Sequence, residues 1–481
     1  MTPNRAMAVV AAALAMGVAP PPDMKPSAWA AEHLVVTDGP KAGQKWDPEE
    51  TPQLVEIIDH LSPTSPANEV VVRKSAQTGY TQGVEAVLGF IIDVAPAPTM
   101  LVIPTVNAAL DFNRDKLAPA IEASRPLRRK VRGQVSRSSS GSKALNKRFP
   151  GGNIVISGAN SAADLRGKTI KIGIGDEIDE WPQDLDNQGD PLAMLAARQI
   201  SYDAAGTWKR LLGSTPTIKG ASRIDAKFEA SDQRFLQVPC PHCDTYQRLH
   251  FFPQVTGEND RDGKPVKRGG LVFNDSYPYD AFYACAHCGA AIHEHHKQAM
   301  IRLGVVRWVP ENPGPGRGPG YHMDAMTSKL VTWERIAEEF LKAKDDPLKL
   351  KAFYNLWLGQ AWEERGDAPE WQRLFARRED YAQGSVPVGG LILTLGVDVQ
   401  GDGLFYEVVA WGPGWESWTV EAGFLAGDTA DPASAPWRLL DAVQERDYPN
   451  AHGGLMRISL TGVDSQYNTG AVHEWTRRKG R

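Results

Sequence analysis

The sequence has 481 residues but only four cysteines, no excess of positive charge, and no apolar run beyond its N-terminus that approaches the length of a membrane span. A transmembrane helix needs about 20 consecutive apolar residues, so a membrane-spanning protein is not indicated. The cysteines occur as two Cys-x-x-Cys pairs, which favours a metal site in a reducing compartment over secreted disulfides. The formal net charge of -5 does not by itself indicate nucleic-acid binding.

Charge is distributed unevenly along the chain. From Arg125 to Phe149 the sequence contains no acidic residue. A surface loop of this composition can neutralise DNA phosphates, but basic runs are often only solvated surface, and both interpretations stay open. The basic residues of this segment are Arg125, Arg128, Arg129, Lys130, Arg132, Arg137, Lys143, Lys147 and Arg148.

The N-terminal segment MTPNRAMAVVAAALAMGVAPPP has the layout of a secretory signal peptide, with a basic residue, a short apolar run and then prolines. Export would carry the chain into an oxidising compartment, which does not suit paired metal-binding cysteines. We therefore expect residues 1–26 to be an N-terminal extension of a cytosolic protein rather than a signal peptide.

The length exceeds what one hydrophobic core usually supports, so two or three domains are expected. Between residues 27 and 235 short apolar strands alternate with helical segments, which predicts a doubly wound α/β sheet. Ligands of such sheets bind beyond the carboxyl ends of the strands. The predicted strands cover residues 69–76, 99–105, 152–159, 169–177 and 208–217, and the predicted helices cover 81–95 and 107–124.

The stretch VVRKSAQTGYTQ, residues 71–82, resembles a phosphate-binding loop in which two fixed residues are replaced. The G-x-x-x-x-G-K-[ST] template places Lys74 on its first glycine and Tyr80 on its lysine. Gly79 can still supply the turn, Thr81 a hydroxyl for Mg²⁺, and the following helix its N-terminal dipole. Lys74 can fold back over the phosphates because its stem is long and flexible. The pattern alone is weak, because a lysine-containing turn before a helix is common.

A second motif, IKIGIGDEIDEW, ends a predicted strand in Asp176 and Glu177. In this interpretation Asp176 holds Mg²⁺, and Glu177 orients and deprotonates an attacking water. The alternative is an acidic turn whose later acids begin the next helix. A third strand runs into Ser214 and Thr215, which could sense the terminal phosphate or simply form a hydroxyl-rich turn.

The cysteines form the pairs Cys240-x-x-Cys243 and Cys285-x-x-Cys288. Four thiolates in two pairs suit a closed, tetrahedral Zn²⁺ site with a structural role, and two redox or disulfide pairs are the alternative. The histidine inside each pair, at positions 242 and 287, is expected to be exposed or to support the ligands rather than to bind the metal.

The rest of the chain contains a proline- and glycine-rich segment, then two helical segments and a β-rich region. Residues 309–321 are rich in proline and glycine and predict a linker or crossing segment. Amphipathic helices are predicted for residues 332–344 and 347–362, and residues 391–423 alternate as an antiparallel hairpin.

Two aspartates in this last region are candidate metal ligands. Asp398 lies in a strand that enters a glycine turn, and Asp464 lies in a similar frame. Cleavage by two metal ions needs several carboxylates that converge on the ions, so these two could be ligands, with Asp402 and Glu407 as weaker candidates. Aspartates at strand ends are also common turn formers.

The three motifs in this order, together with GANSAADLRGKTIKIGIGDEIDEWP, STPTIKGASRI and SDQRFLQVPCPHC, resemble the lambda-type branch of the large terminase subunit of tailed bacteriophages. The resemblance runs from about residue 27 to the C-terminus. It implies a P-loop, ASCE-type doubly wound ATPase domain, an inserted zinc ribbon and a partial RNase H-like α/β nuclease domain. The implied domains are 1–26 (extension), 27–235 (ATPase), 236–305 (zinc ribbon), 306–385 (helical linker region) and 386–481 (incomplete nuclease).

In that family the phosphate loop often carries its lysine at the start, so the resemblance gives the phosphate role to Lys74. It implies catalysis by Glu177, Asp398 and Asp464. The implied ligand sets are Lys74, Ser75, Gly79, Tyr80, Thr81 and Asp176 for ATP and Mg²⁺, Ser214 and Thr215 for coupling, Cys240, Cys243, Cys285 and Cys288 for Zn²⁺, and Asp398 and Asp464 for Mg²⁺ or Mn²⁺ at the nuclease.

The implied activity is ATP-driven translocation of double-stranded DNA into a procapsid, with an associated metal-dependent endonuclease. The implied partners are double-stranded DNA, a small terminase subunit and the portal protein, on which the chain would assemble as a homo-oligomer, without a membrane. The expected location is the cytoplasm of the bacterial host and not the virion. Two alternatives stay open: a helicase-like DNA translocase, and a non-catalytic DNA-binding or assembly remnant of a decaying prophage.

The sequence departs from the family pattern at its end, because TRRKGR follows soon after Asp464 where the family continues to a further catalytic acid. We therefore expect an incomplete nuclease that cuts DNA poorly or not at all. An arginine that stabilises the transition state is also expected, and Arg73, Arg166 and Arg223 are candidates that the sequence does not rank.

Overall fold

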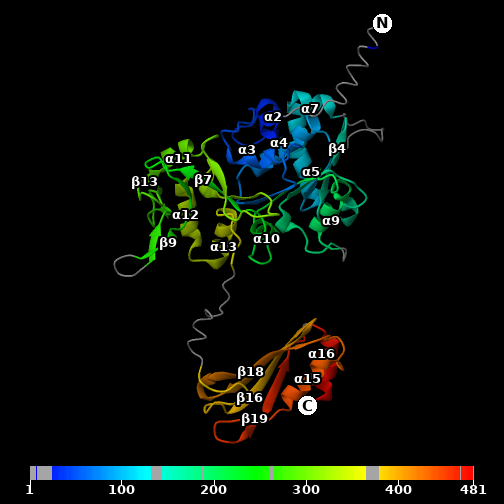
Figure 1. The fold of residues 1–481 in the computed structure, drawn as a ribbon, viewed down its shortest axis with the longest axis vertical. Helices are drawn as coiled ribbons and strands as arrows, with labels where there is room; N and C mark the ends of the chain where they lie inside the picture. Colours follow the sequence, from blue (N-terminus) through cyan, green and yellow to red (C-terminus); the bar gives the residue numbers. More distant parts are fainter. Residues whose placement is uncertain are drawn as a thin grey trace. The chain divides into compact units, whose positions relative to one another are not determined.

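The computed structural model divides the chain into two compact units, Met1–Glu364 and Arg365–Arg481, which we name the first and the second unit (Figure 1). The structure describes residues 7, 24–131, 144–185, 189–259, 265–363, 379–465 and 467–479. Most of the candidate signal peptide and part of the basic segment, including Arg132, Arg137 and Lys143, lie outside these ranges. Within them, no helix combines the length and apolar content that a membrane span requires.

A ten-stranded sheet forms the centre of the first unit, and its middle strands are parallel. Each middle strand carries a nearly continuous run of buried residues, as expected when helices cover both faces of a parallel sheet. Their order is β1 (Glu69–Lys74), β6 (Lys209–Ser214), β5 (Ile172–Asp176), β2 (Pro98–Ile103) and β4 (Gly152–Gly158), with β3 (Asn146–Phe149) antiparallel at the edge.

Helices cover both faces of this sheet (Figure 1). Val70 and Val72 of β1 pack into one core and Val71 into the other, because successive side chains of a strand point to opposite faces. The doubly wound α/β fold expected from the sequence is therefore confirmed. One face carries α2 (Pro26–His33), α3 (Gln53–Asp59), α4 (Tyr80–Asp93), α5 (Val106–Phe112), α6 (Ala118–Ala123) and α7 (Arg125–Lys130), and the other carries α8 (Ala162–Leu165), α9 (Pro191–Ala197) and α10 (Arg223–Glu229).

The sheet continues beyond β1 with strands from much later in the chain. Strand β15 (Gly320–Met323) lies parallel to β1, and beyond it follow β7 (Arg234–Pro239) and the antiparallel β14 (Arg307–Pro310). The segment 309–321, expected to be a linker, thus begins and ends inside the sheet. Strand β15 is buried and β14 is partly exposed, and both form by pairing with strands that are distant in sequence rather than from a local alternation of buried and exposed residues.

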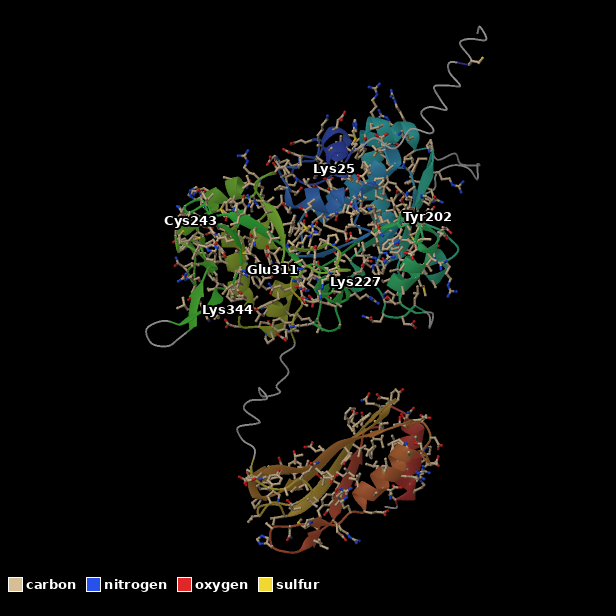
Figure 2. The ribbon with its side chains drawn as sticks, viewed as in Figure 1. Lys25, Tyr202, Lys227, Cys243, Glu311 and Lys344 are labelled. Atoms are coloured by element: carbon tan, nitrogen blue, oxygen red, sulfur yellow. The ribbon has the colours of Figure 1, made fainter. Side chains whose placement is uncertain are left out.

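The cysteine-containing region, residues 240–301, is named the cysteine ribbon here. It shares one hydrophobic core with two later helices, so residues 236–364 pack as part of the first unit. The shared core joins the segments 236–305 and 306–385, for which a ribbon and a helical linker region are expected from the sequence. Figure 2 shows Cys243 of the ribbon and Lys344 near the end of α12 in the same part of this unit, far from Tyr202. The elements are β8 (Tyr246–Arg248), β9 (Gln254–Asn259), β10 (Pro265–Arg268), β11 (Leu271–Val272), β12 (Phe282–Ala284), β13 (Ala291–His293), α11 (Glu294–Met300), α12 (Trp333–Ala343) and α13 (Pro347–Leu356).

The second unit is a four-stranded mixed sheet with helices on one face (Figure 1). Alternate residues of β16 are buried and exposed, so one face packs on the helices and the other stays open. The expected hairpin forms from β16 and β17, and β21 joins β16 in parallel. The elements are β16 (Ile392–Gln400), β17 (Gly403–Trp411), β18 (Ser417–Ala426), α15 (Ala435–Gln444), β19 (Tyr448–Pro449), β20 (Leu455–Met456), β21 (Ile458–Val463) and α16 (Thr469–Arg478).

Candidate functional site

A cavity of about 1100 Å³ opens at the carboxyl ends of β1, β5 and β6 in the first unit. Ligands of doubly wound sheets bind at this edge. The segment before α3, the loop between β1 and α4, the ends of β5 and β6, and helix α13 all contribute to its wall. Among the predicted site residues it is lined by Lys74, Gly79, Tyr80, Thr81, Glu177 and Thr215.

The loop between β1 and α4, residues 75–79, is named the phosphate loop after its expected role. The Ser75 and Ala76 amides are tied to the carbonyls of Met323 and Leu356, at 2.8 and 2.9 Å. The backbone then turns through the left-handed region at Gln77 and Gly79, with φ of 56° and 81°. None of the five amides from residue 77 to residue 81 has an acceptor among the described residues. Amides presented in this way at a helix N-terminus suit an anion.

Lys74 and Glu177 form an ion pair at the bottom of the cavity. The Lys74 side chain is 8% exposed, and its Nζ also lies 5.3 Å from the centre of the Tyr80 ring. The second carboxylate oxygen of Glu177 accepts hydrogen bonds from Ser214 Oγ at 3.3 Å and from the Thr215 amide at 3.0 Å. The predicted cation, carboxylate and hydroxyl motifs, which are far apart in sequence, therefore meet at one side chain.

Two predicted site residues, Asp176 and Ser214, contact Glu177 but do not line the cavity. Asp176 accepts a hydrogen bond from the Glu177 amide at 3.0 Å, and Ser214 donates its hydroxyl to the Glu177 carboxylate at 3.3 Å. Burial raises the pKa of Asp176 to about 6, while the Lys74 charge opposes this shift and the Glu177 charge adds to it. Ser75 is fully buried, and its hydroxyl donates a hydrogen bond to the Ala76 carbonyl. It is not among the residues that line the cavity, so the cavity does not support the expected contact of Ser75 with nucleotide.

Tyr80 packs against the sheet. Its ring covers Gly213 of β6 so closely that a Cβ there would lie 2.3 Å from the ring. Its hydroxyl is buried without a hydrogen-bond partner among the described residues, and burial, with the Asp176 and Glu177 charges, raises its pKa well above the ordinary value. A side chain fixed in this way fills space and leaves the cation role to Lys74.

We expect Tyr80→Phe to change ATP turnover by no more than about twofold and to leave the melting temperature equal or slightly higher, because the lost hydroxyl is buried and unpaired. Turnover assays and thermal melts test this. The matched variant Gly213→Ala, which pushes a methyl group into the same ring, is expected to destabilise the protein. A severe loss of turnover in a stable Tyr80→Phe protein would give the hydroxyl a role in the site.

Two of the three candidate arginines are held by structural contacts. Arg73 is buried, donates to Asp225 at 2.6 Å and lies over the Phe228 ring. Arg223 donates to three backbone carbonyls, those of Ile178, Trp181 and Pro182. Arg166 is exposed. None of the three lines the cavity, so the described part of the chain does not identify an arginine that could reach a bound phosphate.

Several parts of the site are not predicted by the sequence. Asp179, which the sequence allows to be only a helix start, accepts from Thr217 at 3.0 Å and from the Ile224 amide at 2.8 Å and so fixes the loop after β6. Helix α13 forms one wall of the cavity. Only α13 had a local signal, its amphipathic pattern, and that pattern does not say what the helix contacts. The α13 residues in the wall are Leu348, Lys351, Ala352, Asn355 and Leu356.

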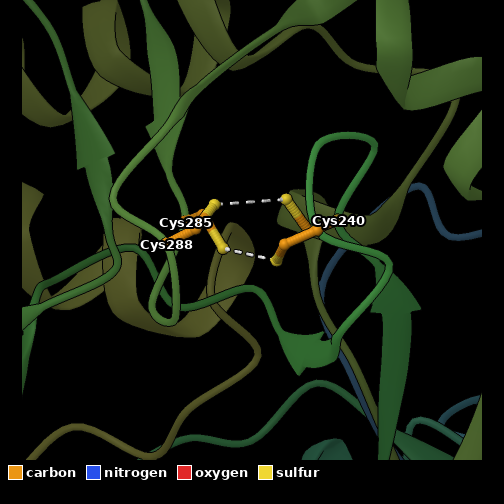
Figure 3. A group of neighbouring side chains, drawn as sticks. Cys240, Cys285 and Cys288 are labelled. Atoms are coloured by element: carbon orange, nitrogen blue, oxygen red, sulfur yellow. Dashed lines mark hydrogen bonds between the residues drawn. The ribbon is translucent and has the colours of Figure 1, made fainter.

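The four cysteines converge in the ribbon, with all Sγ atoms within 4.8 Å of one another. The Cys240–Cys288 and Cys243–Cys285 Sγ pairs are 3.9 Å apart. Figure 3 draws these sulfur contacts as dashed lines. A disulfide needs about 2.05 Å, whereas two thiolates on one Zn²⁺ with bonds of about 2.3 Å lie nearly 4 Å apart. The amides of residues 242 and 287 point at the sulfurs of Cys240 and Cys285. The four sulfurs are therefore arranged so that they could hold a metal ion.

Asp398 and Asp464 occupy neighbouring backbone positions in the second unit. Asp398 lies in β16, and Asp464 directly follows β21, whose Val463 pairs in parallel with Val397; the Asp464 amide donates to the Val397 carbonyl at 2.8 Å. Both are exposed, and Glu407 lies on the same face, where it accepts from Thr419 at 2.6 Å. Among the described residues, only the cysteines form a group of three or more potential metal ligands.

Comparison with known proteins gives matches along most of the chain. Residues 41–308 match the family model "Phage terminase large subunit gpA, ATPase domain", and residues 318–481 match "Terminase large subunit gpA, endonuclease domain". The chain is 30% identical to the terminase large subunit of Enterobacteria phage P21 over 82% of its own length and 62% of the relative's. It is 27% identical to that of Escherichia phage lambda, over 81% and 61%.

The chain thus spans about three fifths of the length of these relatives. Among solved structures, the HK97 bacteriophage large terminase matches with a TM-score of 0.44 and 12% identity, over 95% of this chain and 78% of that one. The two family models together cover the sheet with its cavity, the cysteine ribbon and the second unit. The chain belongs to the phage terminase large subunit gpA family.

Proposed function

We propose that this chain is the large subunit of a DNA-packaging terminase, in which the first unit hydrolyses ATP to drive double-stranded DNA into a procapsid. One observation carries the ATPase part of the proposal. Unpaired loop amides and a buried lysine at the end of β1 converge on one cavity with a glutamate at the end of β5, which is hydrogen-bonded to the end of β6. The family membership supports the packaging part.

The residues around the cavity have different roles in phosphoryl transfer. The free amides of residues 77–81 hold the phosphates, and Lys74 neutralises charge that develops on them. Oxygen ligands suit Mg²⁺, which would supply charge neutralisation. The Thr81 hydroxyl lines the cavity and could hold the ion directly, whereas the Asp176 carboxylate, behind Glu177, would hold it through water. Glu177 orients the attacking water and accepts its proton.

The contacts of Glu177 also suggest how hydrolysis is linked to the fold. Its carboxylate is held on one side by Lys74 and on the other by Ser214 and Thr215. An anionic phosphate competes for Lys74, which releases one oxygen of Glu177 toward the cavity. Because Ser214 and Thr215 are hydrogen-bonded to Glu177, a movement of its carboxylate also moves them. These two residues begin the loop after β6, which Asp179 holds through its hydrogen bond with Thr217.

The direct test is ATP hydrolysis by the full chain with and without double-stranded DNA. We expect phosphate release that rises on addition of DNA. A helicase-like translocase would in addition separate the strands of a forked duplex, which we do not expect here. Absence of turnover under all conditions would favour a non-catalytic DNA-binding remnant.

We further propose that the four-cysteine site holds Zn²⁺ in a structural role. The proposal is supported by four thiolates, the closed geometry and the burial of Cys240 and Cys285, since closed sites without an open coordination position are structural. In cells we place the protein in the cytoplasm of the bacterial host. There the small terminase subunit, the portal and further copies of this chain are the proposed partners.

For the second unit we propose a metal-dependent endonuclease site at Asp398 and Asp464, with Mg²⁺ or Mn²⁺ as the ion. Two adjacent carboxylates can hold one ion, but two-metal cleavage needs more ligands, and the described residues add no third acid to this pair. We therefore expect at most slow nicking of plasmid DNA in Mn²⁺, abolished by Asp398→Ala.

The matched control for this prediction is Asp402→Ala. Asp402 lies in the turn that follows β16, outside the pair formed by Asp398 and Asp464. Nicking by this variant is expected to remain near that of the unmodified chain. If the unmodified chain cuts DNA rapidly in Mg²⁺ and Asp398→Ala abolishes this cutting, the site assignment is supported but the expected low nuclease activity is wrong. Cutting that survives Asp398→Ala would remove the site assignment.

A further inference from the structure

Helix α13 forms the wall of the cavity next to the phosphate loop. The Ala76 amide of that loop donates to the Leu356 carbonyl at the end of the helix, at 2.9 Å. Three residues further along, Gly359 packs so closely on the loop that a Cβ there would lie 2.9 Å from the Ser75 amide nitrogen. These contacts hold the cavity face of α13 close to any ligand that occupies the phosphate loop.

The cavity face of α13 carries a lysine. Lys351 lines the cavity together with Asn355, which lies about one helical turn further on. The helix itself, Pro347–Leu356, contains no acidic residue. At a rise of about 1.5 Å per residue, Lys351 lies roughly 7.5 Å along the helix from the end that is bonded to the loop. Its long, flexible stem can carry the ammonium group toward that end.

The position of Lys351 differs from that of the other lysines in the cavity wall. Lys41 and Lys116 are paired with acids of neighbouring segments, and Lys45 is exposed. By contrast, Lys74 comes directly before the phosphate loop, and Lys351 belongs to the helix that is hydrogen-bonded to it. Among the described residues no arginine lines the cavity, so lysines are the side chains that can balance the charge of a triphosphate there.

Unpaired polar atoms in the same wall also point to a ligand. The Oδ1 atom of Asn355 is buried and has no hydrogen-bond partner among the described residues. The hydroxyls of Thr51 and Thr78, which line the cavity as well, are buried and unpaired in the same way. Leaving a buried polar atom without a partner is unfavourable, and a ligand with hydroxyl groups and phosphates can supply the missing partners. A nucleotide is a ligand of this kind.

We propose that Lys351 is a nucleotide-binding residue whose ammonium group pairs with phosphate oxygens of ATP, so that α13 supplies a second cation beside Lys74. This inference rests on the ATPase function proposed above. A lysine binds phosphate as a point charge, which suits a side chain that reaches the ligand from a neighbouring helix. Asn355 then accepts a hydrogen bond from a hydroxyl of the same nucleotide.

A nucleotide held by Lys351 would contact a helix that is tied to both sides of the site. Phe353 of α13 packs in the core that the helix shares with the cysteine ribbon. Beyond α13, the Trp362 amide donates to the Thr217 carbonyl at 2.8 Å, in the loop after β6 that Asp179 holds. Helix α13 therefore lies between the phosphate loop, the loop after β6 and the ribbon.

The test measures binding of a non-hydrolysable ATP analogue with Mg²⁺ to the full chain by titration calorimetry. Lys351→Met keeps the apolar stem but removes the charge, and we expect it to weaken binding by about tenfold or more. Lys351→Arg keeps the charge and is expected to bind within about threefold of the unmodified chain. Thermal melts without nucleotide should be alike for all three proteins, because Lys351 is only partly buried.

Lys349→Met is the matched control. Lys349 lies on the same helix, but it is exposed, lies 3.4 Å from Asp346 and does not line the cavity. This variant should bind the analogue like the unmodified chain. The inference is overturned if Lys351→Met binds normally, if Lys351→Arg loses as much affinity as Lys351→Met, or if Lys349→Met does. An unmodified chain that binds no nucleotide would refute the proposed ATPase as well, whereas binding that does not depend on Lys351 refutes only this inference.

Discussion

Lys74→Ala is expected to reduce ATP turnover about a thousandfold or more and to weaken nucleotide binding as well. The variant removes the cation nearest to the free amides of the phosphate loop, and charge stabilisation of this kind contributes several kcal/mol to phosphoryl transfer. It also leaves Glu177 without its partner in the ion pair. Steady-state phosphate release and binding of a fluorescent ATP analogue measure the two effects.

Glu177→Gln separates binding from chemistry at the same site. The amide keeps the size of the side chain and can still bond to Ser214 and Thr215, but it cannot accept a proton from water. We expect nucleotide binding within a fewfold of the unmodified chain and turnover lower by about 10² to 10⁴-fold. A Lys74→Ala protein that binds normally would instead place the phosphates away from this loop.

The matched controls are Lys45→Ala and Glu180→Gln. Both residues line the same cavity and are exposed, but neither belongs to the group around Glu177. Turnover within about threefold of the unmodified chain is expected for each, since exposed charges at a cavity mouth contribute little. If the two controls lose as much turnover as Lys74→Ala, then any substitution in the cavity wall disrupts the enzyme. The loss in Lys74→Ala and Glu177→Gln would then not be evidence for the catalytic roles of these two residues.

The parts of this site that the sequence predicts are those with a local physical cause. A short run of buried β-branched residues followed by Gly79 and a helical pattern predicts a strand, a turn and a helix without knowledge of the rest of the chain. Asp176 and Ser214 each end such a strand. Because carboxyl ends of parallel strands meet at one edge of a sheet, their gathering there follows from the fold class.

The parts that the sequence does not predict depend on partners far away in the chain. Strand β15 has four residues in a Gly-rich segment, and it exists because its backbone pairs with β1 and β7. Helix α13 is joined to the phosphate loop by a backbone hydrogen bond from the Ala76 amide to the Leu356 carbonyl. Neither leaves a pattern in composition or spacing.

This packing connects the cysteine site to the cavity of the first unit. Phe251 of the ribbon contacts Phe340 of α12 and Phe353 of α13, with ring centres 5.0 and 5.1 Å apart. Helix α13 in turn lines the cavity and bonds to the phosphate loop through Leu356. A ribbon that loses its metal would thus loosen the wall of the cavity without touching any residue that contacts phosphate.

Cys243→Ser is therefore expected to lower both the melting temperature of the chain, by about 10 °C or more, and ATP turnover, by about tenfold, because structural Zn²⁺ contributes its binding free energy to folding. Metal analysis should find the cysteine site of this variant without Zn²⁺, and added Zn²⁺ should not restore turnover. The comparison variant Thr245→Ala changes the same loop but removes no sulfur, and it should keep its Zn²⁺. A Cys243→Ser protein that retains one Zn²⁺ and melts like the unmodified chain would contradict a structural four-thiolate site. Loss of Zn²⁺ with unchanged turnover would instead show that α13 holds its place without support from the ribbon.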